Sequence, residues 1–299
     1  MNEPSSLVRS PRIELPPGDA GYYYDARVTA GLHGEIRVSK AVADHCTCGG
    51  RPPYQIFTGP ESEPRWCPCR PYRMRVARVN RLIADSGIPE RFRFRFLDTF
   101  IEDNPNGQAI PGAARLKAHV STLIDRFKLD PAMRADRQQN GMRETAPPKG
   151  LFLWGVPGNG KTHLACIALN ELIFSSARPG KFVGISRKFF QTIRHTFDEA
   201  SPTHGQAGAI IENLSTVPFL VIDDLGVQRD TEWEVETLYN LVDARYSERK
   251  LTLITTNKDV NEIKNLAGGR IYSRFLEMCT IIHMTAADYR EHYKKELEL

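Results

Sequence analysis

Short apolar runs alternate with longer amphipathic segments through the second half of the chain. Four runs rich in apolar residues predict buried strands, at 151–154, 181–185, 219–222 and 251–255. Three segments with helical spacing lie between them, at 162–174, about 187–200 and about 232–246. This alternation predicts an α/β fold with a parallel sheet and helices on both of its faces.

The first half of the chain is patterned differently. Residues 1–20 contain several prolines and few large apolar side chains, which predicts a flexible tail. A small domain over 21–85 surrounds a cluster of cysteines, and the large α/β domain follows over 86–299. Within it, residues 130–149 are rich in Arg, Gln, Pro and Gly without an apolar period, so we expect a flexible loop there.

The composition is that of an ordinary globular protein, with 41% apolar and 25% charged residues among 299. Forty basic against 36 acidic residues give a formal net charge of +4, too small to indicate nucleic-acid binding by itself. No run approaches the roughly 18 apolar residues of a membrane-spanning helix. Residues 1–12 also lack the apolar core of a secretory signal. The expectation is a cytoplasmic protein without membrane contact.

A glycine-rich loop separates the first predicted strand from the first predicted helix. Residues 155–162 match the pattern G-x-x-x-x-G-K-[ST] at every fixed position. Glycines let backbone N–H groups curl round a phosphate, and the positive end of the following helix adds to the attraction. A chance glycine-rich turn is the alternative, but the strand before the loop and the helix after it favour a nucleoside triphosphate site.

Each residue of this loop has an expected task. Lys161 neutralises the β and γ phosphates, and the Thr162 hydroxyl ligates Mg²⁺. The complete set expected to bind the nucleotide is Gly155, Pro157, Gly158, Asn159, Gly160, Lys161, Thr162 and His163.

Acidic residues follow the third predicted strand. Asp223 is expected to hold the Mg²⁺ ion, and Asp224 to act as general base on the attacking water. A solvated acidic turn is the alternative. Asn257, which follows the fourth strand, is expected to orient the same water, although alone it would be an ordinary turn residue.

These motifs together resemble a known family. The segments that carry the resemblance are Gly155–Thr162, Ile222–Gly226, Thr231–Glu234 and Thr255–Asn257. They are similar to the AAA+ ATPases of the DnaC/IstB type, which are bacterial and phage helicase loaders and transposition helper ATPases. The resemblance spans roughly residues 86–292 and implies an AAA+ P-loop domain that binds and hydrolyses ATP with Mg²⁺. Asp224 stands where most AAA+ proteins have Glu, and the DnaC/IstB branch often has Asp there.

The resemblance also assigns three arginines. Arg274 corresponds to the arginine finger that reaches the nucleotide of an adjacent subunit, with Arg270 supporting it. Arg290 corresponds to the sensor-2 arginine, which touches the phosphate of its own subunit and belongs to both the catalytic and the nucleotide-binding set. A surface arginine on a helix is the alternative for each. An interfacial finger implies that the ATPase is an oligomer.

Contacts to single-stranded DNA are implied in the same way. The resemblance places them at Arg194, Phe197, Thr231 and Trp233. A basic side chain that follows the phosphate backbone and an aromatic face for base stacking suit that role. The helical spacing of Phe189, Phe190 and Ile193 instead favours a buried face, and Phe197 fits either interpretation.

Two closely spaced pairs of cysteines dominate the small domain. Cys46, Cys48, Cys67 and Cys69 form two C-x-C pairs separated by 18 residues, as expected for a structural Zn²⁺ site. An iron–sulfur cluster, a site using His45 or His33, and four unrelated buried cysteines are the alternatives. The remaining cysteines, Cys166 and Cys279, lie in apolar surroundings and are expected in the core.

Arginines crowd the residues after the cluster. No acidic residue lies between Pro64 and Ala84, so this run is either a solvated face or a docking surface for an acidic partner. The alternating Arg-Phe stretch at 91–96 corresponds to the family segment that leads into the ATPase core near the adenine.

The combined prediction is an ATP-dependent helicase loader for DNA replication that binds single-stranded DNA. By resemblance to one group of loaders, its zinc-binding domain binds the replicative helicase. The alternative is a transposition helper ATPase that assembles on DNA and recruits a transposase, and the zinc-binding domain favours the loader. A third hypothesis, a module that uses ATP only as an assembly ligand, is disfavoured by Asp224, Asn257 and Arg274.

Overall fold

The computed structural model describes ten stretches of the chain. They are residues 12–25, 34–57, 59, 63–103, 107–128, 148–185, 187–196, 202, 204–226 and 231–286. The chain divides into two compact units, Met1–Leu82 and Ile83–Leu299. Within the described residues, no helix has the length and apolar character needed to cross a membrane.

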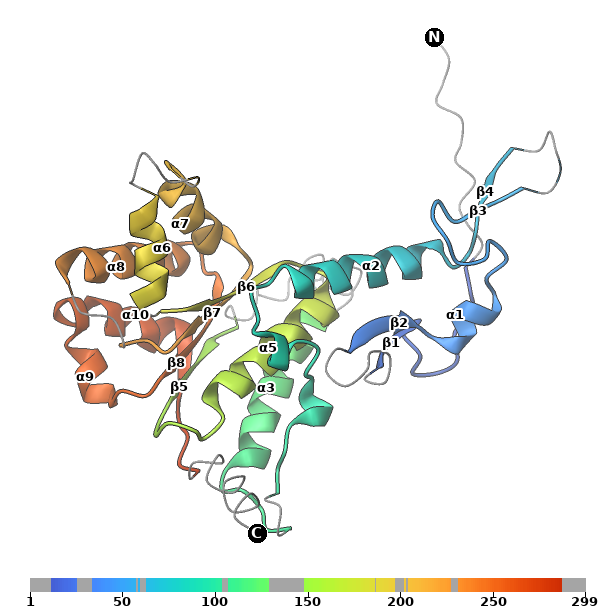
Figure 1. Cartoon of the computed structure of the whole chain (residues 1–299). Coiled ribbons are helices and arrows are strands. Elements are labelled where there is room, and N and C mark those ends of the chain that lie inside the picture. Colours follow the sequence, from blue (N-terminus) through green and yellow to red (C-terminus); the bar gives the residue numbers. More distant parts are fainter. Residues whose placement is uncertain are drawn as a thin grey trace, which may run out of the picture. The chain divides into compact units, whose positions relative to one another are not determined.

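The N-terminal unit consists of two small antiparallel ribbons and two helices (Figure 1). Its elements are β1 (Tyr22–Asp25), β2 (Glu35–Val38), α1 (Lys40–Asp44), β3 (Gln55–Ile56), β4 (Arg65–Trp66) and α2 (Arg70–Ala84). The ribbons pair β1 with β2 and β3 with β4. One cluster of its core joins the buried residues Ile13, Val42, Cys67 and Cys69, and Ile36 and Val79 are buried elsewhere in the unit. Because Ile13 belongs to this core, the packed part of the unit begins before residue 21, where the sequence predicted its start.

The C-terminal unit contains a five-stranded parallel sheet with helices on either side. Two short 3-10 turns precede it, η1 (Glu90–Phe92) and η2 (Leu97–Thr99). The strands are β5 (Gly150–Trp154), β6 (Gly180–Gly184), β7 (Phe219–Asp223), β8 (Leu251–Thr256) and β9 (Cys279–His283). The helices are α3 (Ala113–Lys128), α5 (Lys161–Ser176), α6 (Arg187–His195), α7 (Ala207–Thr216), α8 (Glu232–Ser247), α9 (Val260–Lys264), η3 (Leu266–Gly269) and α10 (Arg270–Met278).

The order of strands across the sheet is β6-β7-β8-β5-β9, and every pair is parallel. All residues of β7 and β8 are buried, as are the first four of β5. Strands covered on both faces need continuous apolar runs, which is why the sequence shows runs rather than alternation here. The predicted α/β fold is confirmed, and each of the four predicted strands is present within one residue of its expected limits.

The fifth strand, β9, was not predicted. Its residues Cys279, Ile281 and Ile282 were interpreted only as scattered core positions, because Thr280 and His283 interrupt the apolar run. In the structure β9 pairs along β5 from Gly150↔Cys279 to Trp154↔His283. Half-burial at the edge of the sheet explains the mixed composition.

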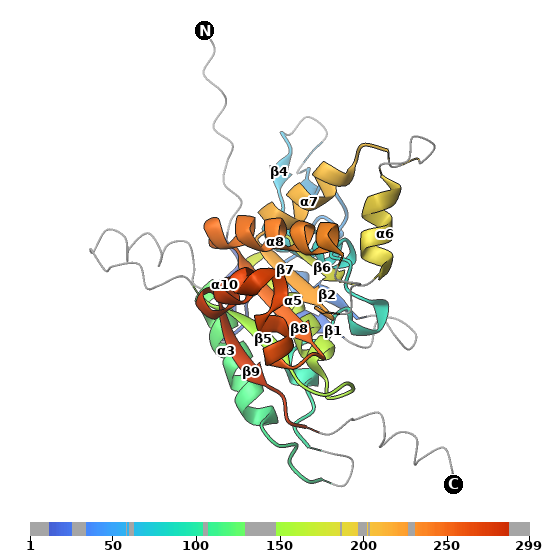
Figure 2. The same ribbon diagram turned by 90° about the vertical axis from the view of Figure 1, so that its left-hand side faces the viewer.

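Helices cover both faces of the sheet (Figures 1 and 2). On one face α5 packs against β6, β7 and β8, and α3 packs on α5. On the other face α8 contacts α7 and α10, and α10 contacts β9; Figure 2 views the unit from this side. The core beneath α8 and α10 joins Leu238 and Phe275 to Phe152, Ile222 and Ile254 of the strands.

One sequence-based boundary differs from the structure. The helix expected to reach residue 200 ends at His195, and Thr196 caps a turn by donating its hydroxyl to the Ile193 carbonyl at 2.6 Å. The alternating Arg-Phe stretch forms turns, and Asn170 of α5 donates its side-chain amide to the carbonyls of Phe92 and Arg95.

One arginine is fully buried in this core. Arg245 of α8 has 0% of its surface exposed. Its guanidinium donates to the carbonyls of Leu214, Val217 and Leu251 at 2.6–2.9 Å and to the Thr252 hydroxyl at 2.9 Å. Burial lowers the pKa of this guanidinium. These four acceptors, from two segments, therefore tie α8 to the end of α7 and the start of β8.

Candidate functional site

The glycine-rich loop lies between β5 and α5. Gly155, Gly158 and Gly160 have φ of 147°, 79° and 91°, values that residues with a side chain rarely adopt. A Cβ at Gly155 would also lie 2.3 Å from the Met284 carbonyl oxygen, so that position requires glycine. α5 begins at Lys161, directly after Gly160, and its first N–H groups are available to an anion.

Lys161 is held by the loop itself. Its Nζ donates to the carbonyls of Gly155 at 2.9 Å and Val156 at 2.6 Å, and to Asn159 Oδ1 at 2.9 Å. Asn159 in turn donates its amide to the Met284 carbonyl at 2.7 Å. Lys161 is only 4% exposed, and its ammonium lies inside the curve of the loop, where a phosphate group would bring oxygens to it.

The two residues expected to hold Mg²⁺ lie together. Thr162 Oγ1 donates to Asp223 Oδ1 at 2.8 Å, and Thr255 Oγ1 donates to the same oxygen at 2.5 Å. Burial raises the pKa of the Asp223 carboxyl, while both hydroxyls oppose that shift. Thr255 was not among the predicted site residues. Its signal in the sequence was a polar residue near the end of β8, the strand that lies beside β7.

Asp224 and Asn257 also come together. Asn257 Nδ2 donates to Asp224 Oδ1 at 3.0 Å. Asp224 has a φ of 54°, and its N–H donates to Thr255 Oγ1 at 3.1 Å. This left-handed turn directs the carboxylate away from the strand, and both side chains line the same cavity as Lys161 and Thr162.

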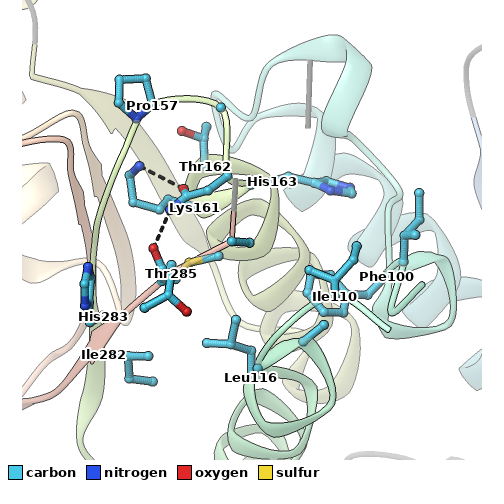
Figure 3. A pocket seen from close by; sticks show the side chains of 18 of the residues that line it. Phe100, Ile110, Leu116, Pro157, Lys161, Thr162, His163, Ile282, His283 and Thr285 are labelled. Atoms are coloured by element: carbon cyan, nitrogen blue, oxygen red, sulfur yellow. Dashed lines mark hydrogen bonds between the residues drawn. The ribbon is translucent and has the colours of Figure 1, made fainter. Parts of the chain in front are cut away.

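That cavity measures about 1310 Å³ and extends from the loop to an apolar wall. Figure 3 shows Lys161 and Thr162 at one end, with Ile282 and His283 on the side opposite Phe100 and Ile110. Leu116 of α3 closes the apolar end. Polar groups at one end and an apolar wall at the other match the two halves of a nucleotide.

His163, the remaining residue of the predicted set, stacks on Phe92 with ring centroids 5.3 Å apart. Both residues line the cavity. Burial lowers the pKa of His163, and the charges of Arg95 and Arg91 lower it further. The Arg-Phe stretch therefore reaches the nucleotide cavity through Phe92.

A family model described as IstB-like ATP binding protein matches residues 117–297. The chain belongs to this family. It is a DnaC/IstB-type AAA+ ATPase, as the motifs predicted.

Individual relatives agree with this placement. The replicative helicase loader DnaC of Escherichia coli (strain K12) is 34% identical over 122 residues, which cover 40% of this chain and 47% of that protein. The YqaM protein of Bacillus subtilis (strain 168) is 26% identical over 218 residues, or 71% of this chain and 60% of YqaM. A crystal structure of the DnaC helicase loader superposes with a TM-score of 0.50 at 23% identity, over 66% of this chain and 100% of that one. The chain thus matches about half the length of the curated loaders, and the solved structure supports the fold.

The arginines assigned by resemblance lie on α10 or beyond it. Arg274 pairs with Asp243, donating from Nε at 2.6 Å, and donates from Nη2 to the Tyr239 hydroxyl at 2.9 Å. Arg270 stacks over the Tyr239 ring at 4.7 Å. Neither arginine is among the described residues that line the cavity. Arg290 lies outside the described residues.

Three of the four residues expected to contact DNA form one cluster. The Arg194 guanidinium lies 5.0 Å from the centre of the Trp233 ring and donates to Thr231 Oγ1 at 3.4 Å. It also pairs with buried Glu234 at 3.1 Å. The fourth residue, Phe197, lies outside the described residues. The predicted burial of Phe190 and Ile193 on the inner face of α6 is confirmed, and Phe189 is partly buried there.

The cysteine cluster is compact. The four sulfur atoms of Cys46, Cys48, Cys67 and Cys69 lie within 4.8 Å of one another. Cys46–Cys48 and Cys48–Cys69 sulfur distances are 3.7 and 3.6 Å. A tetrahedron with Zn–S bonds of about 2.3 Å has edges of about 3.8 Å, so the sulfurs are spaced to hold one Zn²⁺.

Neighbouring groups favour a thiolate at Cys67 of this cluster. Burial raises the pKa of the Cys67 thiol, but backbone N–H groups of Cys69, Thr47 and Cys48 outweigh it and lower that pKa to about 6. Of the alternative ligands, His45 hydrogen-bonds to the Ala41 carbonyl of its own helix, and His33 lies outside the described residues. Cys166 and Cys279 are buried in the C-terminal unit, as predicted.

Proposed function

We propose that this protein is an ATP-dependent DNA helicase loader that acts in DNA replication. The observation that carries the proposal is the hydrogen bond between Asp224 and Asn257, which both line the cavity at the phosphate loop. The chain that contains this pair is 34% identical to a helicase loader over 122 residues. Such a pair has no use in a protein that only binds nucleotide, so we infer that ATP is hydrolysed.

Each group at the cavity has a task in that reaction. Lys161 leaves the loop carbonyls and bonds to the β and γ phosphates, and the loop N–H groups hold the remaining oxygens. Thr162 and Asp223 hold Mg²⁺, which neutralises charge on the phosphates. Asp224 accepts a proton from the attacking water while the Asn257 amide fixes the direction of that carboxylate.

The site becomes complete only when a second subunit adds its arginine. Asp243 and Tyr239 hold the Arg274 guanidinium in one orientation, which reduces the entropy lost when it meets a phosphate. Arg274 then stabilises the charge that develops on the transferred phosphoryl group of the neighbouring subunit. Arg290 is proposed to contact the phosphate of its own subunit.

We propose single-stranded DNA as the ligand of the cluster formed by Arg194, Thr231 and Trp233, with Phe197 as the fourth proposed contact. The Arg194 side chain is 47% exposed although it is paired with Glu234. A guanidinium over an indole ring offers both a positive charge and a stacking surface, the two features that single strands use.

The four cysteines are proposed to hold a structural Zn²⁺ ion that orders the N-terminal unit. This unit is the proposed docking site for the replicative helicase, and the C-terminal unit responds to ATP and DNA. Nucleotide state would then control when the helicase is released.

The second candidate is an IstB-like transposition helper, which the family match over residues 117–297 favours. The helper would assemble on DNA and recruit a transposase. The cysteine cluster favours the loader, because a separate metal-bound unit offers a dedicated docking surface.

One experiment separates the two candidates. The full chain is immobilised and offered a purified replicative helicase or a transposase from the same source, with ATP present. Retention of the helicase supports the loader. If Cys67→Ser loses this retention and Cys279→Ala keeps it, the helicase-binding surface is assigned to the N-terminal unit. Retention of the transposase instead would reverse the choice.

A further inference from the structure

The β3–β4 ribbon of the N-terminal unit presents aromatic side chains on its outer face. Ile56 of β3 packs against the unit's core. Side chains alternate along a strand, so the neighbours Gln55 and Phe57 point to the opposite face. Trp66 of β4 is the cross-strand partner of Gln55 and shares that face. Phe57 is 66% exposed, more than any other large apolar side chain among the described residues.

Arginines surround this aromatic face. The Arg70 guanidinium lies 3.8 Å from the centre of the Trp66 ring. Arg51 is exposed just before β3, whereas Arg65 is the cross-strand partner of Ile56 and belongs to the other face of the ribbon. Between His45 and Ala84 the chain has seven arginines and only two acidic residues, Glu61 and Glu63.

We propose that this outer ribbon face is a second binding site for single-stranded DNA, distinct from the Arg194 cluster. The positive charge complements a polyanion, and the rings of exposed Phe57 and partly exposed Trp66 complement unpaired bases. A single strand uses both features at once, with phosphates at Arg51 and Arg70 and bases on Phe57 and Trp66. The site goes beyond the proposed function, which assigns DNA only to α6 and α8.

Binding of a fluorescein-labelled oligothymidylate to the full, metal-loaded chain tests this directly by fluorescence anisotropy. Phe57→Ala combined with Arg51→Glu should weaken binding about tenfold, since it removes one stacking ring and reverses one phosphate contact. The slope of log K against log salt should fall by about one. Phe57→Tyr keeps the stacking surface and should bind within about twofold of the wild type.

Two controls separate this face from general damage. Tyr23→Ala removes an exposed aromatic residue from the β1–β2 ribbon of the same unit and should leave binding unchanged. Metal content is measured on every variant. Cross-linking to an oligonucleotide that contains 5-bromodeoxyuridine should label peptides that contain Phe57 or Trp66.

Unchanged affinity and salt slope in the double variant, with no cross-link in the ribbon, would overturn the proposal. Loss of helicase retention with full DNA binding would also overturn it, because the face would then be a protein docking surface. Failure of the helicase experiment above leaves the ribbon's DNA contact intact, so the two proposals fail separately.

Discussion

The nucleotide site and the cysteine cluster both depend on turns, but different forces hold those turns in place. Asp223, Asp224 and Asn257 follow the buried strands β7 and β8, which pack between helices on both faces. The cluster instead lies in a unit with few buried apolar residues among those that the structure describes, namely Ile13, Ile36, Val42, Val79 and the cysteines Cys67 and Cys69.

Core packing therefore fixes the geometry of the nucleotide site, whereas we expect a bound metal to fix the geometry of the cysteine cluster. A sheet covered on both faces buries enough apolar surface to fix its loops before any nucleotide arrives. So few buried apolar residues stabilise the N-terminal unit by less than its ordering costs, and we therefore expect a bound metal to supply the remainder. Loss of metal should therefore unfold mainly the N-terminal unit, and a core substitution in the C-terminal unit should destabilise mainly that unit.

Removal of metal is the largest expected effect. A strong chelator should unfold the N-terminal unit, because a structural Zn²⁺ contributes about 10 kcal/mol or more to such small domains. Limited proteolysis should then cut within residues 12–82, while a fragment containing the nucleotide site persists and still binds ATP.

The matched substitutions are Cys67→Ser, which should release the metal, and Cys279→Ala, which should retain one metal per chain. An unchanged proteolytic pattern after complete metal removal would mean that packing, not metal, holds the N-terminal unit.

Substitution of the buried Arg245 should instead destabilise the C-terminal unit and leave the N-terminal unit intact. Arg245→Met leaves the carbonyls of Leu214, Val217 and Leu251 without their donor, at a cost of about 3–5 kcal/mol. Urea unfolding should show a less stable C-terminal unit with unchanged metal content. Arg249→Met, on an exposed residue, is the control and should stay within about 0.5 kcal/mol.

Loss of the Asn257 amide should lower the rate of ATP hydrolysis without changing nucleotide affinity. Asn257→Ala removes the donor that directs Asp224, so ATP turnover should fall roughly 30-fold, or about 2 kcal/mol. Nucleotide affinity, measured by equilibrium titration, should remain unchanged. A large loss of affinity instead would mean that Asn257 supports the loop rather than the reaction.

The smallest effect is expected at Thr255. Thr255→Val removes one of two hydroxyl donors to Asp223, which should weaken binding of Mg–ATP roughly fivefold, or about 1 kcal/mol. Binding of ATP without Mg²⁺ should be unaffected. Thr216→Val removes a comparable hydroxyl bond on the surface of α7 and serves as the control. Equal losses with and without Mg²⁺ would contradict a metal-positioning role.

The parts of the site that the sequence predicted are those whose chemistry demands fixed neighbours along the chain. A phosphate loop needs glycines, a lysine and a threonine in one short segment, so Gly155 to Thr162 were visible at once. Apolar runs likewise predicted β5 to β8.

Contacts made by strand order were not predictable in the same way. β5 lies between β8 and β9, which follow it by about a hundred residues or more, and nothing in the apolar pattern states that order. The bond from Asn159 to the Met284 carbonyl and the bond from Thr255 to Asp223 both depend on it. In the N-terminal unit the pairing of four cysteines was visible, but the burial of Ile13 beside them was not.

The central claim is an ATPase whose active site is completed by a second subunit, and mixing two inactive variants tests it most directly. Lys161→Ala lacks a working phosphate loop, and Arg274→Ala lacks the finger. Each alone should hydrolyse ATP at least about 100-fold more slowly than the wild type with single-stranded DNA present. Mixed in equal amounts, they should recover a measurable fraction of wild-type turnover, because an intact loop then meets an intact Arg274. No recovery, or normal turnover by Arg274→Ala alone, would contradict the claim.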